Sequence, residues 1–328
     1  MIRKTLYMCA LVISSALLAL NACGSTTQAH HETLNSHVNE QALKHAHEQK
    51  SIWDTELADA SRFTLNIKLS AKETKIAKKF ARTITKNLKQ NEVYVHYLLT
   101  KFKENDLPLE LAAIPLLESG LEPYAVSHTG AHGPWQYIRS TGRSLGLHKT
   151  ENYDGIYDFF ASTDAGVEYL KKLYADLGNW EFVALAYNQG EYGVKKAISS
   201  AKKSGILDPK VSDLKTTRYG QTYVMRFKAF ADVLKNPNKY GVSLPKIVNR
   251  PAFKRVEVAG RLDSLEEAAR LSGAQLKILK KLNSGYTGDK IDGKHGLKMP
   301  IEHAATLEKA IENRNAVASN KSTQALKL

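Results

Sequence analysis

One glutamate in this 328-residue chain ends a long apolar run, and its position suits acid chemistry. Residues 111–117 carry neither charge nor hydroxyl, and Glu118 follows them, with Ser119 and the helix-stopping Gly120 next. An all-apolar run belongs inside a domain. Because burial disfavours a charged carboxylate, we expect Glu118 to keep its proton near neutral pH, as a general acid for glycoside cleavage requires. For an isolated Glu-Ser-Gly triplet, a surface Glu at a helix end is the alternative.

Polar and aromatic groups gather in the stretch that follows this acid. Residues 123–137 combine glycines with Ser127, Trp135 and Gln136. Glycine lets the backbone approach a ligand closely, and a glutamine amide offers both a donor and an acceptor to sugar hydroxyls and amides. An aromatic face packs on a sugar ring, although Trp135 can equally fill the core. The pattern indicates a cleft for a polar ligand beside Glu118.

A series of helices must hold these groups. Apolar residues recur every three or four positions over 72–88 and 91–104, which predicts two amphipathic helices. The apolar run before Glu118 should form the next helix, kinked or restarted at Pro115 because proline lacks a backbone donor. Further helices are expected over 163–177, 180–187, 190–201 and 217–235. The helix over 180–187 is nearly all apolar and ends on Tyr187 and Asn188, which again delivers polar groups to a cleft.

About ten short motifs in this order resemble the soluble-lytic-transglycosylase family. They are Glu118-Ser119-Gly120, Ala125-Val126-Ser127, Gly130-Ala131-His132-Gly133, Trp135-Gln136-Tyr137, Thr141-Gly142, Gly146-Leu147, Ala161-Ser162-Thr163, Tyr169-Leu170, Trp180 and Ala186-Tyr187-Asn188-Gln189-Gly190-Glu191. The resemblance covers roughly residues 50–301 and implies a mainly α fold, a goose-type lysozyme-like helical catalytic domain. We place that domain at 61–244, with its core motifs at about 105–200.

The resemblance also implies an activity and a set of site residues. The family cleaves the β-1,4 bond between N-acetylmuramic acid and N-acetylglucosamine without water, leaving a 1,6-anhydro sugar. Glu118 would be the catalytic acid and base. The glycan would contact Ser127, Gln136, Tyr137, Tyr187, Asn188 and Tyr223. No cofactor and no metal are implied. Pro134, Tyr137, Ile138-Arg139 and Gln189 depart from the usual family residues, which leaves the subsite preferences open.

One carboxyl is enough for such a reaction if the substrate supplies the nucleophile, whereas ordinary glycosidases use two. The nearby acids Glu122, Asp154, Asp158 and Asp164 suit turns and helix caps, with Asp164 in a first helical turn. Two other functions stay open. One is a hydrolytic muramidase on the same fold, and the other is a non-catalytic lipoprotein that binds peptidoglycan.

The carboxy-terminal part reads as a second, smaller unit. A strand near 253–258, helices near 265–271 and 274–282 and a strand near 297–301 form a βααβ pattern. The pattern resembles a divergent LysM glycan-binding module over 252–301. Two roles are open for it, glycan binding or packing on the catalytic domain alone. Residues 302–328 should form a short helix and a polar, disordered tail.

The amino-terminal part resembles an export signal followed by a lipidation site. Residues 1–22 have the charged start and apolar stretch of an export signal, and Leu20-Asn21-Ala22-Cys23 resembles a lipobox despite Asn21. Cys23 would be lipidated, and residues 23–60 would tether the enzyme to the membrane. Gly24 after it implies the periplasmic face of a bacterial outer membrane. The formal net charge of +14 suits an anionic partner, and the export signal disfavours nucleic acid.

Overall fold

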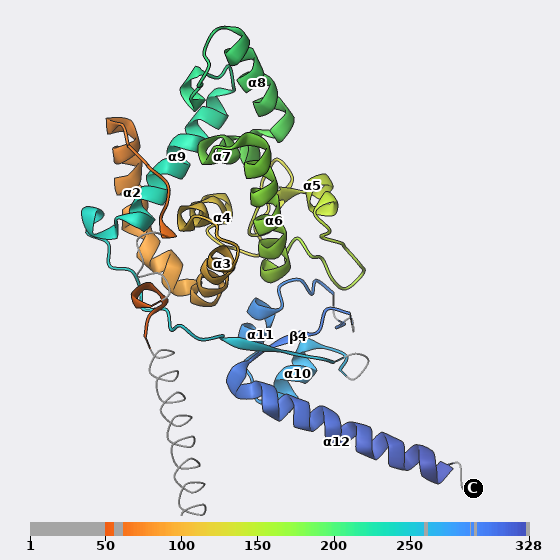
Figure 1. Cartoon of the computed structure of the whole chain (residues 1–328). Coiled ribbons are helices and arrows are strands. Elements are labelled where there is room, and N and C mark those ends of the chain that lie inside the picture. The colour runs from red at the N-terminus through yellow and green to blue at the C-terminus, as the bar shows by residue number, and fades with distance from the viewer. Residues whose placement is uncertain (1–49, 56–61, 259–261, 289, 292–293, 326–328) are drawn as a thin grey trace, which may run out of the picture.

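The computed structural model describes residues 50–55, 62–258, 262–288, 290–291 and 294–325. A mainly helical domain carries a small α+β unit at one end (Figure 1). The predicted export signal, Cys23 and most of the predicted tether lie outside the described residues. The tether predicted over 23–60 was too long, because Ile52 is buried in the core and the Trp53 indole N–H donates to the Pro245 carbonyl at 2.9 Å. Within the described ranges, no helix has both the length and the apolar character needed to cross a bilayer.

Two predicted amphipathic helices open the domain. The first, α2 (Ala71–Gln90), begins with a capping box, in which Ser70 and Glu73 each accept a hydrogen bond from the other's backbone N–H. Its apolar side packs against α9 (Arg218–Lys235), with Phe80 beside Phe230. The second, α3 (Glu92–Glu104), buries five side chains in the core: Tyr94, Val95, Leu98, Leu99 and Phe102.

The apolar run before Glu118 forms two helical pieces. A 3₁₀ turn, η3 (Leu109–Ala112), leads directly into α4 (Ala113–Ser119), and Pro115 is the third residue of α4. An N–H in the first turn of a helix has no partner within the helix, so proline costs little there. Of the two predictions for Pro115, a restart is confirmed. Gly120, at φ 65°, ends α4 and leaves Glu118 in its last turn.

Three helices then pack in sequence. They are α6 (Phe159–Leu177), α7 (Trp180–Gln189) and α8 (Glu191–Lys203). The start predicted for α6 was four residues too late, because Asp158 caps the helix by accepting hydrogen bonds from the N–H groups of Phe160 and Ala161. The prediction that Asp164 lies in a first turn was therefore wrong. Its carboxylate instead accepts a hydrogen bond of 2.7 Å from the Tyr97 hydroxyl.

Short elements complete the helical domain. They are η1 (Ile52–Asp54), α5 (Arg139–Ser144), η4 (Val211–Asp213), η5 (Pro237–Tyr240) and an antiparallel pair formed by β1 (Ala131–His132) and β2 (Tyr137–Ile138). The β1–β2 pair lies inside the loop region that the sequence marks as polar and glycine-rich.

The smaller unit has the predicted strand–helix–helix–strand order. Its elements are β3 (Phe253–Val256), α10 (Leu265–Ser272), α11 (Leu276–Leu282) and β4 (Leu297–Pro300). The two strands pair antiparallel, with Val256 opposite Leu297. Buried residues from all four elements, including Leu265, Leu279 and Met299, form a core of its own.

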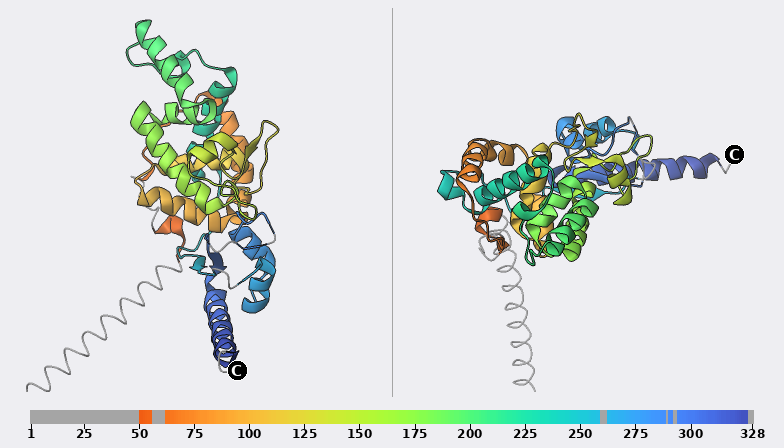
Figure 2. Two further views of the ribbon diagram at one scale, coloured as in Figure 1. Left: turned by 90° about the vertical axis from the view of Figure 1, so that its right-hand side faces the viewer. Right: turned by 90° about the horizontal axis from the view of Figure 1, so that it is seen from above.

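The prediction of a short final helix and a disordered tail was wrong for residues 301–325. These residues form one helix, α12 (Ile301–Ala325), which extends away from the rest of the molecule (Figure 2). The segment contains no Gly or Pro and is rich in Ala, so nothing in its sequence stops a helix. Its first turns pack Ala304, Leu307 and Ile311 on the smaller unit.

Polar contacts fix the smaller unit to the helical domain. The Lys298 ammonium lies 2.8 Å from the buried carboxylate of Asp158, at the start of α6. The backbone N–H of Asp154 donates to the Gly285 carbonyl at 2.7 Å, and Tyr94 donates to the Lys281 carbonyl. Of the two roles considered for this unit, packing on the helical domain is observed, and glycan binding stays a prediction.

Candidate active site

Glu118 lies half-buried at the end of α4 and is bound to a residue of α9. Its Oε1 accepts a hydrogen bond of 2.7 Å from the Tyr223 hydroxyl. Burial raises the pKa of Glu118 from 4.5 to about 7, and the Tyr223 hydrogen bond and the positive charge of Arg226 lower it only in part. The sequence-based expectation of a carboxyl that keeps its proton near neutral pH is therefore confirmed. The contribution of Arg226 was not predicted.

Two buried tyrosines lie in the electrostatic field of this carboxyl. Burial raises the pKa of both Tyr137 and Tyr187, and the negative charge of Glu118 raises each further. Their ring centroids are 6.2 Å apart, and the Tyr187 hydroxyl donates to the Trp135 carbonyl at 2.5 Å. The structure thus brings together four of the predicted site residues from four elements: Glu118, Tyr137, Tyr187 and Tyr223.

Trp135 belongs to the core. Its side chain is fully buried, and its indole N–H donates to the Thr163 hydroxyl at 3.1 Å. A Cβ on Gly166 of α6 would come within 2.8 Å of the ring, so glycine there makes room for the indole. The ring also stacks on Tyr137, with 6.3 Å between centroids and 7° between planes. Of the two readings of Trp135, core filling is confirmed, and through Tyr137 the ring supports the site.

Ser127 and Gln136 make hydrogen bonds inside their own loop. The Gln136 side-chain amide donates to the Gly133 carbonyl at 2.8 Å and to the Ala125 carbonyl at 3.2 Å. The Ser127 hydroxyl accepts from the Ala131 N–H at 2.9 Å. Within the described part of the chain, neither side chain is hydrogen-bonded to Glu118. Both therefore hold the shape of the loop.

The loop is tied to the residue next to Glu118, and Gly133 within it requires glycine. The Ser119 hydroxyl, next to Glu118, donates to the Pro134 carbonyl at 2.7 Å. Gly133 has a φ of 77°, and a Cβ there would lie 2.1 Å from the Ile156 carbonyl oxygen. A backbone oxygen cannot swing away as a side chain can, so residue 133 must be glycine for the loop to close against residue 156.

The end of α7 carries buried polar atoms that are unpaired in the described residues. They are the Oδ1 of Asn188 and the Nε2 of Gln189, which packs against Gly220 of α9. A buried polar atom without a partner costs about 1–3 kcal/mol, so such atoms call for an explanation. The position of Asn188 directly after Tyr187 is consistent with a ligand contact.

The other acids near Glu118 in the sequence have structural partners. Asp154 pairs with Arg139 at 2.5 Å, and Glu122 accepts a hydrogen bond from the Tyr124 N–H at 3.3 Å. Burial alone would raise the pKa of Asp158, but Lys298 beside it holds that pKa below its ordinary value. Asp164 is bonded to Tyr97, as described above. Turn and capping roles were predicted for these acids, and capping is confirmed for Asp158.

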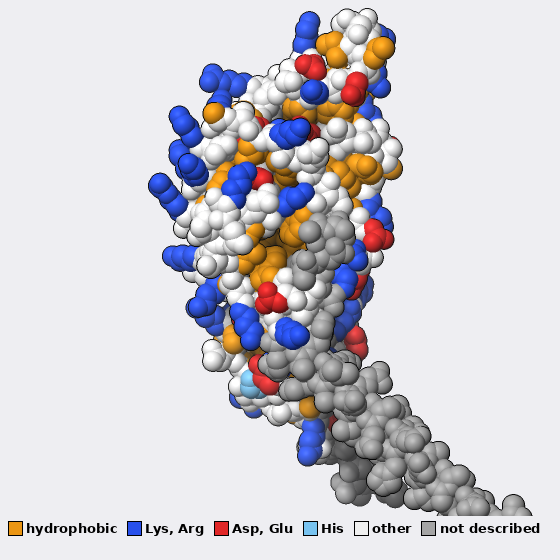
Figure 3. Space-filling view, turned by 60° about the vertical axis from the view of Figure 1, so that its left-hand side comes forward, with side chains coloured by type: hydrophobic (Ala, Val, Ile, Leu, Met, Phe, Trp, Pro, Cys, Tyr) orange, Lys and Arg blue, Asp and Glu red, His pale blue; other side chains and the backbone are white. Residues whose placement is uncertain are grey.

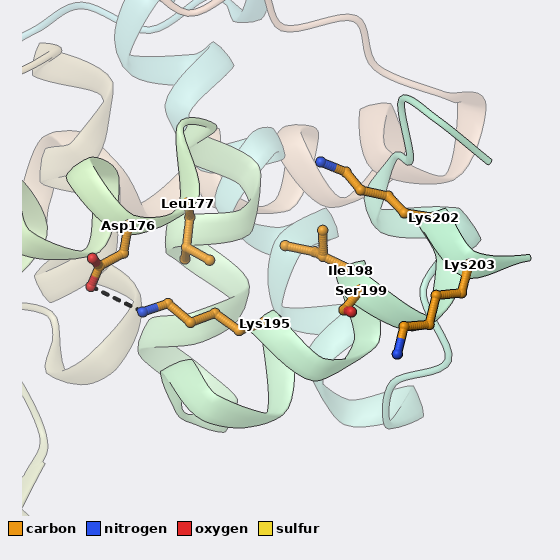
Figure 4. A pocket seen from close by; sticks show the side chains of 7 residues that line it. All are labelled: Asp176, Leu177, Lys195, Ile198, Ser199, Lys202 and Lys203. Carbon is orange, nitrogen blue, oxygen red and sulfur yellow. Dashed lines mark ion pairs between the residues drawn. The ribbon is translucent and has the colours of Figure 1, made fainter. Parts of the chain in front are cut away.

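A cavity of about 510 Å³ lies elsewhere on the domain, beside α6 and α8 (Figure 4). It is lined by Asp176, Leu177, Lys195, Ile198, Ser199, Lys202 and Lys203. None of the predicted site residues contributes to this lining, so the cavity is separate from the Glu118 site.

The structure shows a mainly helical domain in which a half-buried acid ends an apolar helix, as expected of the lysozyme-like domain that the sequence resembles. Residues 100–208 match the model of the Transglycosylase SLT domain family. Membrane-bound lytic murein transglycosylase D of Escherichia coli (strain K12) is 33% identical over 233 residues, which is 69% of this chain and 50% of that protein. A protein of Alteromonas sp. (strain M-1), named "Putative tributyltin chloride resistance protein", is 31% identical over 194 residues, or 58% of this chain and 89% of that protein. The chain belongs to the lytic transglycosylase family that carries this domain.

The comparisons differ in how much of each relative they cover. The chain spans about half the length of the lytic murein transglycosylase D proteins that it matches. Among solved structures, an inactive mutant of the lytic transglycosylase Slt from Pseudomonas aeruginosa aligns with 46% of this chain and 25% of that one. That alignment has 21% identity and a TM-score of 0.35, and a score at this level does not establish a shared fold.

Proposed function

We propose that this protein is a peptidoglycan lytic transglycosylase. It cleaves the β-1,4 bond between N-acetylmuramic acid and N-acetylglucosamine and leaves a 1,6-anhydro end on the muramic acid. The observation that carries the proposal is the half-buried Glu118, with a pKa of about 7 and a hydrogen bond to Tyr223. A group with that pKa can give a proton and then take one near neutral pH.

The reaction needs two proton transfers by one carboxyl. Glu118 first donates its proton to the bridging oxygen, the bond from the anomeric carbon to that oxygen breaks, and the N-acetylglucosamine side leaves with a hydroxyl. The oxygen of the substrate's own N-acetyl group stabilises the positive charge at the anomeric carbon. The Glu118 carboxylate then removes the proton of the C6 hydroxyl, and the C6 oxygen bonds to the anomeric carbon. Glu118 ends protonated as it began, and no water is consumed.

The surroundings of Glu118 fit both halves of this cycle. Burial favours the protonated form that starts the reaction, while the hydrogen bond from Tyr223 and the charge of Arg226 favour the carboxylate that forms between the two steps. Burial is the larger influence, and the two opposing contributions keep the pKa at about 7, where both forms of the carboxyl are populated near neutral pH. Tyr223 thus acts on the catalytic group directly, and Arg226 acts on it through charge.

The glycan would lie along the surfaces that meet at Glu118. We assign substrate contacts to Tyr137, Tyr187, Asn188 and the loop that holds Ser127 and Gln136. Support comes from the proximity of both tyrosines to Glu118 and from the unpaired Asn188 oxygen. The hydrogen bonds of Ser127 and Gln136 inside the loop favour backbone contacts from this loop over contacts by the two side chains.

We place the enzyme in the bacterial cell envelope, where its substrate is. The lipobox-like sequence ending at Cys23 supports a lipid anchor, and Gly24 supports the periplasmic face of the outer membrane. The membrane-bound murein transglycosylases among its relatives are consistent with this location.

Digestion of purified sacculi in oxygen-18 water tests the proposal. A lytic transglycosylase gives muropeptides with anhydro ends that contain no solvent oxygen. A hydrolytic muramidase gives reducing ends that carry one heavy oxygen and are one water heavier than the anhydro products. Sacculi that stay intact would indicate the third candidate, a non-catalytic lipoprotein that binds the wall.

A further inference from the structure

We propose that one face of α2 docks on an anionic lipid membrane. Six cations form what we call the α2 basic stripe: Lys72, Lys75, Lys79, Arg82, Lys86 and Lys89. The proposal concerns where the protein sits, and it is independent of the murein-cleaving function proposed above.

The stripe is continuous because its members follow one another at steps of three or four residues. Side chains at this spacing lie on the same face of a helix. All six are exposed, while Ala77, Ile84 and Leu88 on the other side of α2 are buried in the core. At 1.5 Å per residue, the stripe spans about 26 Å. Figure 3 shows Lys and Arg side chains gathered along the left edge of the molecule, on the side where α2 lies.

The stripe lacks the acids that normally balance such a surface. Within the described part of the chain, none of the six forms an ion pair. The one acid of α2, Glu73, is buried and lies 3.3 Å from Lys228 of α9. By contrast, Lys195 of α8 is paired with Asp176 at 3.3 Å (Figure 4). Like charges at three- and four-residue spacing destabilise a helix, so the stripe does not stabilise α2.

A membrane fits the stripe better than other anionic surfaces do. The apolar residues of α2 point into the core, so the stripe binds a charged plane without inserting into it. A polybasic patch is attracted to the headgroups of anionic lipids, by about 1 kcal/mol for each cation near the surface. The proposed lipid site at Cys23 lies 48 residues before the start of α2 at Ala71. Lys50, the first residue that the structure describes, follows Cys23 by 27 positions, and 27 residues span at most about 95 Å when fully extended. The domain that carries α2 would therefore stay within reach of the bilayer.

The test uses the full chain with Cys23→Ser, so that binding depends on the protein surface alone. Sedimentation with vesicles that contain phosphatidylglycerol is compared with sedimentation with phosphatidylcholine alone, at low and high salt. One variant replaces Lys75, Lys79, Arg82 and Lys86 with Gln. A control variant with the same loss of charge replaces four exposed lysines elsewhere with Gln, namely Lys196, Lys202, Lys203 and Lys277.

We expect binding to phosphatidylglycerol only, with loss at high salt. Each cation near an anionic surface contributes about fivefold to affinity, so the stripe variant should bind at least about 100-fold more weakly. The control variant should lose less than about threefold. Both variants should unfold at a temperature no lower than the parent chain and should cleave soluble murein fragments at the parent rate, so docking and cleavage are read separately.

Two results would overturn the proposal. Equal losses in the two variants would show that total charge, and not the stripe, sets the binding. Unchanged vesicle binding by the stripe variant, with weakened binding to intact sacculi, would show that the stripe serves the cell-wall polymer instead.

Discussion

The Tyr223 hydroxyl donates a hydrogen bond of 2.7 Å to Oε1 of Glu118, and this contact joins residues 105 positions apart in the chain. It brings α9 against the end of α4. The bond favours the charged carboxylate and therefore opposes the effect of burial on the Glu118 pKa. The proposed reaction, in which one carboxyl is both acid and base, depends on this balance.

Tyr223→Phe should move the alkaline limb of the pH–activity profile to higher pH. The wild type should lose activity above pH about 7, where Glu118 loses its proton, and removal of the hydrogen bond raises the Glu118 pKa further. A hydrogen bond to a charged group contributes about 1.5–3 kcal/mol, so turnover should fall about 10- to 100-fold. Tyr219→Phe is the matched control on α9, since Tyr219 is exposed. An unshifted limb in Tyr223→Phe would contradict the role given to this hydroxyl.

The free energy of unfolding should depend on pH because of Glu118. Its pKa is about 7 in the folded protein and near 4.5 when exposed, so the folded state binds the proton more tightly between these values. Stability should therefore fall as pH rises from about 4.5 to 7, by at most about 3 kcal/mol from this group. Glu118→Gln removes this contribution. The free energy of unfolding of the variant minus that of the wild type should therefore increase as pH rises from about 4.5 to 7. Urea unfolding of both proteins at several pH values measures the difference, and a constant difference would refute the assigned pKa.

Two glycines with similar backbone angles should respond differently to alanine. Gly133 and Gly146 have φ of 77° and 80°, which alanine tolerates at a cost of about 1–2 kcal/mol. A Cβ on Gly133 would also lie 2.1 Å from the Ile156 carbonyl oxygen, whereas a Cβ on Gly146 would meet open space. Gly133→Ala should cost at least about 2 kcal/mol more than Gly146→Ala in denaturant unfolding and should reduce activity more. Equal costs would mean that the loop does not close against residue 156 as described.

The junction between the two units should depend on one buried ion pair. Lys298→Met leaves the Asp158 carboxylate buried without its cation, which typically costs about 3–5 kcal/mol. Lys254→Met removes a solvent-exposed pair with Glu308 and should cost less than about 1 kcal/mol. Calorimetry of both variants provides the comparison. Similar unfolding temperatures for the two would show that Asp158 does not rely on Lys298.

The predictions that succeeded rest on local patterns. Apolar periodicity located α2, α3 and α9 to within a residue or two, and the apolar run located the half-buried acid at Glu118. The family resemblance placed Tyr223 among the site residues, and in the structure its hydroxyl is hydrogen-bonded to Glu118. The order of elements in the smaller unit was also predicted, because strands and capped helices have short-range signals.

The features that were missed depend on contacts between distant segments. Nothing near Arg226 in the sequence indicates that its charge reaches Glu118, and nothing near Asp158 indicates a partner at Lys298. Gln136 has the right chemistry for a sugar contact, but its amide is used by the Gly133 and Ala125 carbonyls. The length of α12 was underestimated because polar composition was given more weight than the absence of helix breakers.

Glu118→Gln tests the one-carboxyl mechanism most directly. Glutamine keeps the size and hydrogen-bonding capacity of the side chain but cannot donate and recover a proton. We expect the variant to fold as the wild type does and to sediment with purified sacculi to the same extent, yet to release no anhydro-muropeptides. Release of anhydro-muropeptides by the folded variant would contradict the mechanism, because another group would then have to perform both proton transfers.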